Sequence, residues 1–450
     1  MSPSTTYVVI GLDFGTSCSK AVVRAPYIVS GGKSWAVYFG RYGHPSNRFL
    51  LPSKIIIAEN GSASLSDPQS EASAFIVGKE FLLTEPDALV SPLNGSAAHA
   101  KAIELSAVFV ALALREVRKW FLDNHRQEFN GNRISWQFNL GVPSRGFDDH
   151  SIRSLFQQIA RASWMLADQQ GNITLDNAKS ALEKSALESL PLSIPLEDIN
   201  VVPEVIAEFV GYALSDRRRD GLHVIADVGA NTFDICAFNL HVRDAELRYP
   251  FLSAIVETHG VFRLHGHRLN VLQKWFSEHL SGMARIEDPA AAIPTDIKYY
   301  LPQQVVLDKV CDKEMESEFL KKCTLQFTQT IHWMLKRDPE SRSWSLGIPC
   351  YFGGGGSAAP LYRMALHKAN EWISFHTKRK HMKLSTIEKP ANLIAKNLEE
   401  SEYHRLGVAS GLSYPARNIG EITSSFNATI IESDHISRYD MAEYVSKDQV

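Results

Sequence analysis

Hydrophobic and polar positions along this chain form two similar hairpin patterns. Over residues 7–24, an apolar run leads into Asp13, a Gly-Thr-Ser turn follows, and a second β-prone run resumes at Ala21. Over residues 223–240, an apolar run again ends at an aspartate, Asp227, before a turn of small residues and a further apolar run. Both stretches predict a strand, a tight turn and a returning strand.

The remaining pattern predicts short strands first and then an alternation of helices with strands. Further strands are expected at 35–39, 49–58, 75–77, 134–142, from 251 and before the glycine run that begins at 353, with a loop over 61–73. Amphipathic spacing predicts helices over 102–121, 152–166, 203–214, 269–280, 312–336 and 405–414. Asp148 or Asp149 should cap the helix at 152–166, and a loop with Gly260 and Gly266 should precede the helix at 269–280. This rhythm indicates an α/β sheet covered by helices.

Three segments stand apart from that rhythm. Residues 168–200 are expected to be a helical insertion with a surface helix over 176–190, and residues 416–450 form a tail without strong periodicity. The helices at 203–214 and 405–414 both carry small residues, so we expect them to cross closely and act as a hinge.

Composition limits the class of protein. The 450 residues are 44% hydrophobic and 22% charged, which suits a globular chain of two or three domains. The net charge of −3 requires neither a nucleic-acid nor a membrane partner. Five dispersed cysteines without a C-x-x-C pair favour a reducing cytoplasm, and the apolar run at 105–114 is too short to span a bilayer.

The first hairpin carries the first candidate chemistry. Asp13 ends an apolar strand, where a carboxylate is costly unless water, a donor or a cation meets it, and it suits a hydrated Mg²⁺. Gly15 lets the backbone approach a ligand, and Lys20 adds a positive charge on the returning strand. The residues that present successive N–H groups to a phosphate are Thr16, Ser17 and Cys18. A β-hairpin with a polar turn is the alternative interpretation.

The second hairpin repeats this design, and the repetition favours a phosphate site over a simple β-hairpin with a polar turn. Asp227 corresponds to Asp13, Gly229 to Gly15, and the turn continues with Ala230, Asn231 and Thr232. Two such hairpins that face each other would hold one polyphosphate and its metal ion. A duplicated architecture with a nucleotide in the cleft between its halves is therefore expected.

A glycine run supplies the third signal. Gly353, Gly354, Gly355 and Gly356 follow an apolar strand, and Ser357 and a helix from about 360 come next. Glycines let a flat or anionic ligand touch the backbone, and a helix N-terminus offers unpaired N–H groups. A flexible loop is the alternative. Two weaker features are a histidine group (His259, His265 and His267), for which a metal site is given little weight, and a basic stretch over 378–383, which favours an exposed loop.

Together the three stretches resemble the nucleotide-binding fold shared by actin, sugar kinases and the seventy-kilodalton heat-shock chaperones, over about residues 7–415. DFGTSCSKAVV resembles the first phosphate loop, DVGANTFDI the second, and FGGGGSAAP the adenosine motif. The helices at 203–214 and 405–414 are similar to the two connecting helices of that fold. The chaperone branch matches best, through PEVIAEFVGYAL and Gly141-Val142-Pro143.

The resemblance implies a duplicated ribonuclease H-like fold, that of the actin-like ATPases. Its first lobe would span 1–215 and return at 405–415, and its second lobe would span 216–404. ATP or ADP would bind with Mg²⁺, the metal held through water by Asp13 and Asp227. The resemblance assigns Thr16, Ser17, Gly229 and Thr232 to the phosphates, Glu204 to the attacking water, and Gly354, Gly355 and Ser357 to the adenosine.

The chain departs from the chaperone pattern at two places. Ala230 and Asn231 replace two further glycines, and the catalytic lysine has only Lys79 and Lys101 as candidates. Lys20 instead matches the phosphate-binding lysine of the actin pattern. No β-rich peptide-binding domain is expected after residue 415, so chaperone activity does not follow.

The expected function is a nucleotide-dependent conformational switch with weak ATPase activity and an unidentified protein partner. Three alternatives stay open: an actin-like filament, a small-molecule kinase and a nucleotide-binding scaffold that has lost hydrolysis.

Overall fold

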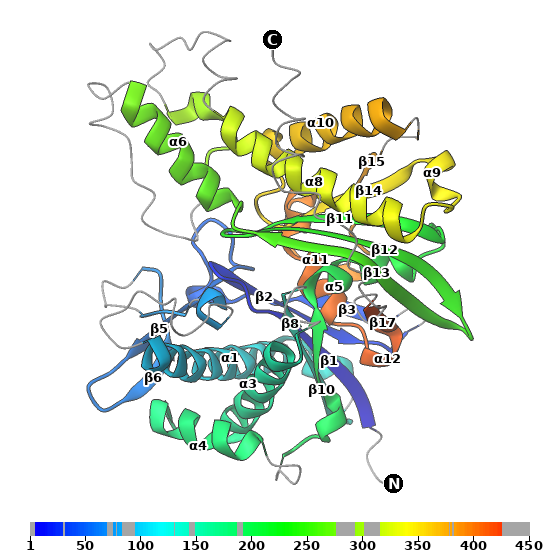
Figure 1. Ribbon diagram of the computed structural model, residues 1–450. Coiled ribbons are helices and arrows are strands. Elements are labelled where there is room, and N and C mark those ends of the chain that lie inside the picture. The colour runs from blue at the N-terminus through cyan, green and yellow to red at the C-terminus, as the bar shows by residue number, and fades with distance from the viewer. Residues whose placement is uncertain are drawn as a thin grey trace. The chain divides into compact units, whose positions relative to one another are not determined.

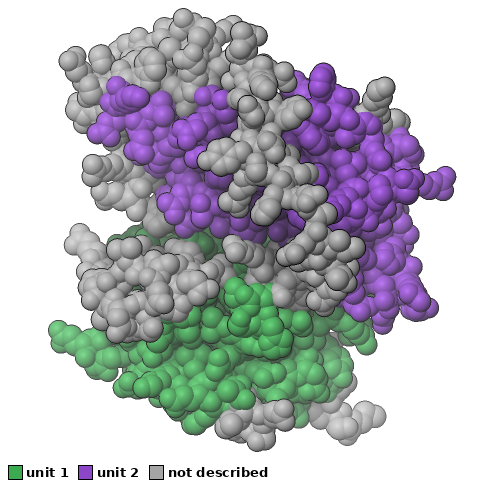
Figure 2. All heavy atoms as spheres, viewed as in Figure 1, with its two compact units in different colours: residues 1–215, 388–419 green, residues 216–387, 420–450 purple. Residues whose placement is uncertain are grey.

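The computed structural model describes residues 5–424 except 30–31, 70–74, 78, 83–94, 130, 144–148, 187–191, 276–292, 301–315, 378 and 380–381. It is a mixed α/β protein whose residues divide into two compact units (Figures 1 and 2). Unit 1 comprises Met1–Ser215 and Glu388–Ile419, and unit 2 comprises Asp216–Ile387 and Gly420–Val450. The chain therefore re-enters unit 1 earlier than the expected return at 405.

Unit 1 is built on a seven-stranded sheet in the order β10-β8-β1-β2-β3-β16, with β4 paired to β2. The strands β10, β8 and β1 are parallel, β1, β2 and β3 are antiparallel, and β16 runs parallel to β3. Their bounds are β1 Thr5–Asp13, β2 Cys18–Ala25, β3 Lys33–Ala36, β4 Leu51–Pro52, β8 Arg133–Val142, β10 Ile199–Pro203 and β16 Leu393–Ile394. A four-stranded sheet adds β5 Lys54–Ile57, β6 Ser62–Leu65, β7 Phe75–Ile76 and β9 Ile173–Thr174. The predicted hairpin over 7–24 is thus confirmed, whereas the loop predicted over 61–73 is wrong where β6 forms.

Helices cover both faces of this sheet. The helices are α1 Gly95–His125, α3 His150–Asp168, α4 Leu175–Ser185, α5 Glu204–Ala213, α11 Gly407–Leu412 and α12 Ala416–Ile419. Val8, Ile10 and Leu12 of β1 belong to the core formed with α1 and α3 on one face, and α11 lies against β1 and β2 on the other (Figure 1). The helix α4 confirms the surface helix predicted over 176–190 as far as Ser185, with its exposed side facing solvent and its alanine and leucine side chains in the same core, and residues 187–190 lie outside the described residues.

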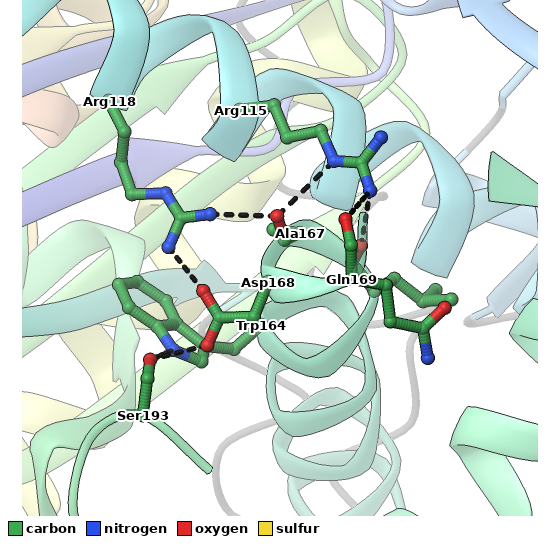
Figure 3. A network of polar contacts seen from close by, with 8 residues as sticks. Arg115, Arg118, Trp164, Ala167, Asp168, Gln169 and Ser193 are labelled. Carbon is green, nitrogen blue, oxygen red and sulfur yellow. Dashed lines mark hydrogen bonds and ion pairs between the residues drawn. The ribbon is translucent and has the colours of Figure 1, made fainter. Parts of the chain in front are cut away.

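A polar network joins α1 to the end of α3 (Figure 3). The guanidinium group of Arg115 donates hydrogen bonds to the carbonyl oxygens of Leu166 at 2.9 Å and Gln169 at 2.5 Å. Arg118 pairs with Asp168 at 2.5 Å and donates to the carbonyl of Ala167 at 2.8 Å. These bonds satisfy carbonyl groups that the last turn of a helix leaves unpaired. At the other end of α3, Asp149 is the N-cap, as predicted, and Asp148 lies outside the described residues.

Unit 2 is built on a six-stranded sheet in the order β15-β14-β11-β12-β13-β17. The strands β15, β14 and β11 are parallel, β11, β12 and β13 are antiparallel, and β17 runs parallel to β13. The strands are β11 Gly221–Val228, β12 Phe233–Arg243, β13 Glu246–Glu257, β14 Ile348–Gly353, β15 Met382–Ser385 and β17 Glu421–Ser424, and the helices are α6 Val261–Trp275, α8 Ser317–Arg337, α9 Ser343–Leu346 and α10 Pro360–Thr377. The even-numbered residues of β11 share a core with α8 and α10 (Figure 1).

Two further predictions need correction. The predicted loop around Gly260 and Gly266 is wrong, because α6 begins at Val261 and Gly266 lies within it. The expected tail is ordered where α12 and β17 form, since β17 pairs with β13, and residues 425–450 lie outside the described residues. No helix in the described part of the chain is long and apolar enough to cross a membrane.

The predicted close crossing of two helices with small residues occurs within unit 1, where it uses Gly411 of α11, as predicted, but not Gly211 of α5. A Cβ atom at Gly411 of α11 would lie 1.5 Å from the carbonyl oxygen of Ala207 in α5. Gly211, which was expected at the crossing, meets only Pro390 at 3.6 Å. The contact therefore depends on Gly411, since only a residue without Cβ lets the two backbones approach this closely.

Candidate functional site

The first hairpin places an aspartate and a lysine side by side. Asp13 ends β1 and is the register partner of Lys20 in β2, and directly opposed residues in an antiparallel pair point to the same face. Lys20 Nζ lies 2.9 Å from Asp13 Oδ2, and the two side chains are 18% and 8% exposed. The Lys20 ammonium group therefore provides Asp13 with a positively charged partner from the chain itself.

The turn between these strands is held by a serine that sequence reasoning missed. Ser53 Oγ donates a hydrogen bond to the carbonyl of Gly15 at 2.7 Å, and Ser53 N donates to the carbonyl of Ser17 at 3.0 Å. A Cβ at Gly15 would lie 2.2 Å from the carbonyl oxygen of Cys18, so this turn requires glycine. Ser53 follows Pro52, which is paired with Cys18, and the only signal in the sequence is a polar residue within an otherwise apolar stretch.

A second lysine and carboxylate meet at the start of α5. Glu204 is the first residue of this helix, and Lys79 Nζ lies 2.7 Å from its Oε1 and 2.9 Å from its Oε2. A Cβ at Gly141 of β8 would lie 2.9 Å from Glu204 Cγ, so this glycine makes room for the glutamate. Of the candidate lysines, Lys79 therefore meets Glu204 and Lys20 meets Asp13, while Lys101, among the described residues, pairs with Glu104 of its own helix at 3.9 Å.

These four side chains form one electrostatic group, which we call the acid–lysine cluster: Asp13, Lys20, Lys79 and Glu204. Burial raises the pKa of the Glu204 carboxyl, the positive charge of Lys79 opposes that rise, and the charge of Asp13 adds to it. The two-oxygen contact with Lys79 nevertheless favours an ionised Glu204, because both short distances suit a carboxylate that accepts from an ammonium group. The cluster thus joins two carboxylates to two ammonium groups.

Unit 2 places the second aspartate beside the second turn. Asp227 belongs to β11, and the turn residues Gly229, Ala230 and Asn231 accept hydrogen bonds through their carbonyls from the backbone N–H groups of 261, 262 and 260 at 2.8–3.0 Å. These donors are at the N-terminus of α6, whose first N–H groups have no partner within the helix. The N–H of Gly229 donates to the carbonyl of Thr232 at 2.9 Å, so it is already engaged within the turn.

The glycine run lies against this aspartate. Gly353 is the register partner of Asp227, and Gly354 has a φ of +75°. A Cβ at Gly354 would lie 2.1 Å from Asp227 Oδ1, so both its backbone conformation and its neighbour require glycine. The buried Ser357 donates from Oγ to the carbonyl of Gly354 at 2.8 Å, whereas Gly355 is exposed. Asp227, the second turn and the glycine run are therefore together in unit 2.

The histidines of the predicted group lie on α6 or just before it and contact neighbouring side chains. His265 and His267 are within α6, and His265 Nδ1 lies 2.7 Å from the hydroxyl of Tyr300, while His259 Nδ1 lies 3.4 Å from Gln326 Oε1. Among the residues that the structure describes, no three histidine, cysteine, aspartate or glutamate side chains gather as metal ligands. Mg²⁺ needs no such cage, because it commonly binds one or two carboxylates, water and substrate phosphates. Asp13 in unit 1 and Asp227 in unit 2 each offer carboxylate oxygens of that kind.

The fold and these groups define a mixed α/β protein with one aspartate-bearing hairpin in each unit. Comparison of the chain with protein-family models and with curated proteins finds no match.

Proposed function

We propose that this protein binds ATP with Mg²⁺, hydrolyses it slowly and acts as a nucleotide-dependent switch on a duplicated ribonuclease H-like fold. One observation carries the proposal. In each unit three antiparallel strands adjoin two further strands that run parallel to the first, and that first strand carries an aspartate as its last residue in unit 1 and as its last residue but one in unit 2. Asp13 and Asp227 therefore occupy equivalent positions in two sheets of the same strand order.

The chemistry of the acid–lysine cluster supports hydrolysis. Phosphoryl transfer needs little covalent chemistry from the protein and depends on positioning and neutralised charge. In the proposed mechanism, the Glu204 carboxylate accepts a hydrogen bond from the attacking water, and Lys79 keeps that carboxylate ionised and oriented. Lys20 and the turn backbone bind phosphate oxygens. The bound Mg²⁺ supplies further charge neutralisation, with Asp13 and Asp227 holding it through water.

In unit 2 the same proposal gives each element a task. Asp227 holds a metal-bound water, and the exposed Gly355 offers backbone to the adenosine. Hydrogen bonds from the start of α6 hold the turn at 229–232 in one conformation. The turn is therefore ordered before a nucleotide binds. The resemblance assigned Gly229 to the phosphates. Its N–H already donates to the carbonyl of Thr232, so the proposed mechanism gives it no contact with phosphate.

Isothermal titration of the full chain with ATP and Mg²⁺ tests binding. The parent should bind, and Asp13→Ala and Asp227→Ala should each weaken binding by about tenfold or more, the effect expected for loss of a charged contact. Asp123→Ala is the control, since this carboxylate is 57% exposed on α1 and pairs only with Lys119. If the parent binds no nucleotide, the proposal is wrong.

Phosphate release tests hydrolysis separately. Lys79→Met should lower the rate of phosphate release by roughly a hundredfold, within the range for loss of general-base assistance, and Glu204→Gln should do the same. Both variants should still bind ATP. Binding by the parent without phosphate release would instead favour the nucleotide-binding scaffold.

A further inference from the structure

We infer that Lys20 is the resident cation of Asp13, and that a divalent cation reaches Asp13 only after a nucleotide phosphate has drawn Lys20 away. This inference rests on the proposed function and concerns how its metal enters.

Geometry gives the first argument. The ammonium group of Lys20 is 2.9 Å from Asp13 Oδ2, which is where a metal-bound water would lie. The pairing is fixed by the register of β1 and β2, in which Asp13 and Lys20 are opposed, and the neighbouring Ser19 and Ala21 are buried. Asp13 therefore meets the lysine whenever the hairpin is formed and no stronger cation is present.

The position of the ammonium group gives the second argument. Lys20 Nζ lies 3.2 Å from the point that a Cβ of Gly15 would occupy, so it lies beside the turn that we assign to the phosphates. A phosphate group at this turn competes with Asp13 for the same ammonium group, and a terminal phosphate as a whole carries more negative charge than one carboxylate. Lys20 can exchange one partner for the other through its flexible side chain alone.

Charge gives the third argument. In the acid–lysine cluster, two lysines balance two carboxylates, so the cluster is formally neutral without nucleotide. A neutral cluster attracts a divalent cation weakly, because the attraction of Asp13 is offset by the repulsion of Lys20. Polyphosphate reverses this balance, since it adds negative charge at the ammonium groups. Nucleotide is thus expected to bind first and metal second at this carboxylate.

A metal titration without nucleotide tests the inference directly. Mn²⁺ serves as the probe, and its free concentration is measured by electron paramagnetic resonance with the full chain. Lys20→Met should bind one additional Mn²⁺, or bind Mn²⁺ roughly tenfold more tightly than the parent, because the competing charge is gone. Lys20→Met combined with Asp13→Asn should lose this gain. An unchanged Mn²⁺ affinity in Lys20→Met would overturn the inference.

A nucleotide titration supplies the second arm. ATP affinity is measured with excess Mg²⁺ and with excess EDTA. Lys20→Met should weaken ATP binding about tenfold more in EDTA than in Mg²⁺, because only without metal is Lys20 the main counter-charge at this turn. Lys20→Arg should restore most of the parent's affinity in EDTA. Equal weakening under both conditions would mean that Lys20 is only a phosphate contact, and the inference would be wrong.

Lys33→Met is the matched control, and the two titrations together distinguish failure of the inference from failure of the proposed function. Lys33→Met removes another ion-paired lysine of unit 1, whose Nζ lies 2.6 Å from Glu128, and it should change neither titration. If no variant binds ATP with or without Mg²⁺, the proposed function fails, and the Mn²⁺ titration still decides whether Lys20 and a divalent cation compete for Asp13.

Discussion

The two hairpins share a backbone plan and differ in the residue that faces the aspartate. In unit 1, Asp13 is opposed by Lys20, and in unit 2, Asp227 is opposed by a second acid, Asp234. Opposed side chains lie close on one face of the sheet, so the first pair attracts and the second repels. The same strand order thus carries a neutral pair in one unit and an acidic pair in the other. Strand order alone does not set the charge at the end of a hairpin.

The strands that lead to the two aspartates differ as well. Two residues before Asp13 is Gly11, and two residues before Asp227 is the fully buried Ile225. A Cβ at Gly11 would lie 2.4 Å from Ser413 N and 2.6 Å from the carbonyl oxygen of Ala409, because α11 rests on this part of β1. The small residue in unit 1 therefore makes room for a helix, whereas unit 2 fills the equivalent position with a branched side chain.

The largest expected loss of unfolding free energy comes from giving residue 11 a side chain, as residue 225 has in unit 2. Gly11→Ala places a methyl group within contact distance of two backbone atoms, neither of which can rotate away. Overpacking of this kind costs about 3 kcal/mol when the neighbour cannot yield. The free energy of unfolding, measured by urea denaturation of the full chain, should fall by about this amount.

Gly266→Ala is the matched control for that substitution. No atom lies within 4 Å of the Cβ position at Gly266, and the residue is within α6. Alanine should therefore leave unfolding unchanged or stabilise the protein by up to about 1 kcal/mol through its better helix propensity. Equal effects of the two substitutions would show that α11 does not need Gly11.

A smaller change in unfolding free energy is expected from the residues four positions before the two aspartates. These residues are Val9 in unit 1 and His223 in unit 2. His223 is stacked between Phe238 and Tyr351, with ring centroids 5.9 and 6.3 Å away, and burial lowers its pKa to about 4. Because the unfolded pKa is about 6.5, the unfolded chain takes up a proton first as pH falls. The stability that neutral His223 contributes is complete above pH 6.5 and is lost as the pH falls toward 4.

His223→Phe should remove this pH dependence. The parent should lose about 2 kcal/mol more of its unfolding free energy than the variant between pH 7 and pH 5, as linkage requires for such a shift. Urea denaturation at both pH values measures the difference. His367→Phe is the control, since the side chain of His367 is 76% exposed, and it should follow the parent. A variant of His223 with the parent's pH dependence would contradict the buried neutral histidine.

Local pattern was enough to predict most of the strands and helices that these comparisons use. The β1–β2 hairpin, the strand β8 and the cap at Asp149 each depend on residues close in sequence. The wrong predictions are those where contact with a segment distant in sequence determines the secondary structure. The strand β6 pairs with β5 through the register of Ile56 with Ser64, and α6 starts early because its first N–H groups find the carbonyls of the second turn.

In the candidate site, too, contacts between residues close in sequence were predictable and contacts between distant residues were not. Asp13 and Lys20 are seven residues apart on one hairpin, so their contact follows from the predicted turn. Lys79 and Glu204 are 125 residues apart, and no local pattern selects Lys79 over Lys101 as the partner. The contact of Ser53 with Gly15 was likewise outside the reach of local pattern, because the two residues lie in segments far apart in the chain. The close crossing of α5 and α11 was predicted from their small residues, but the partner of Gly411, which is Ala207, was not.

The smallest expected effect tests the charge difference itself. A double-mutant cycle of Asp13→Asn with Lys20→Met should give a favourable coupling energy of about 1 kcal/mol, because this ion pair is only partly exposed. The equivalent cycle of Asp227→Asn with Asp234→Asn should give a coupling of opposite sign and somewhat smaller size, as for like charges opposed on a sheet. Each single variant and each double variant is unfolded in urea at pH 7.

The sign of the two couplings is more informative than their size. Asp13→Asn leaves the Lys20 ammonium group without its partner, so this single variant should be destabilising by itself. Added salt should bring both couplings toward zero, since screening weakens attraction and repulsion alike. Two couplings of the same sign would show that the opposed residues do not set the charge at these turns, and the contrast between the hairpins would then be one of packing alone.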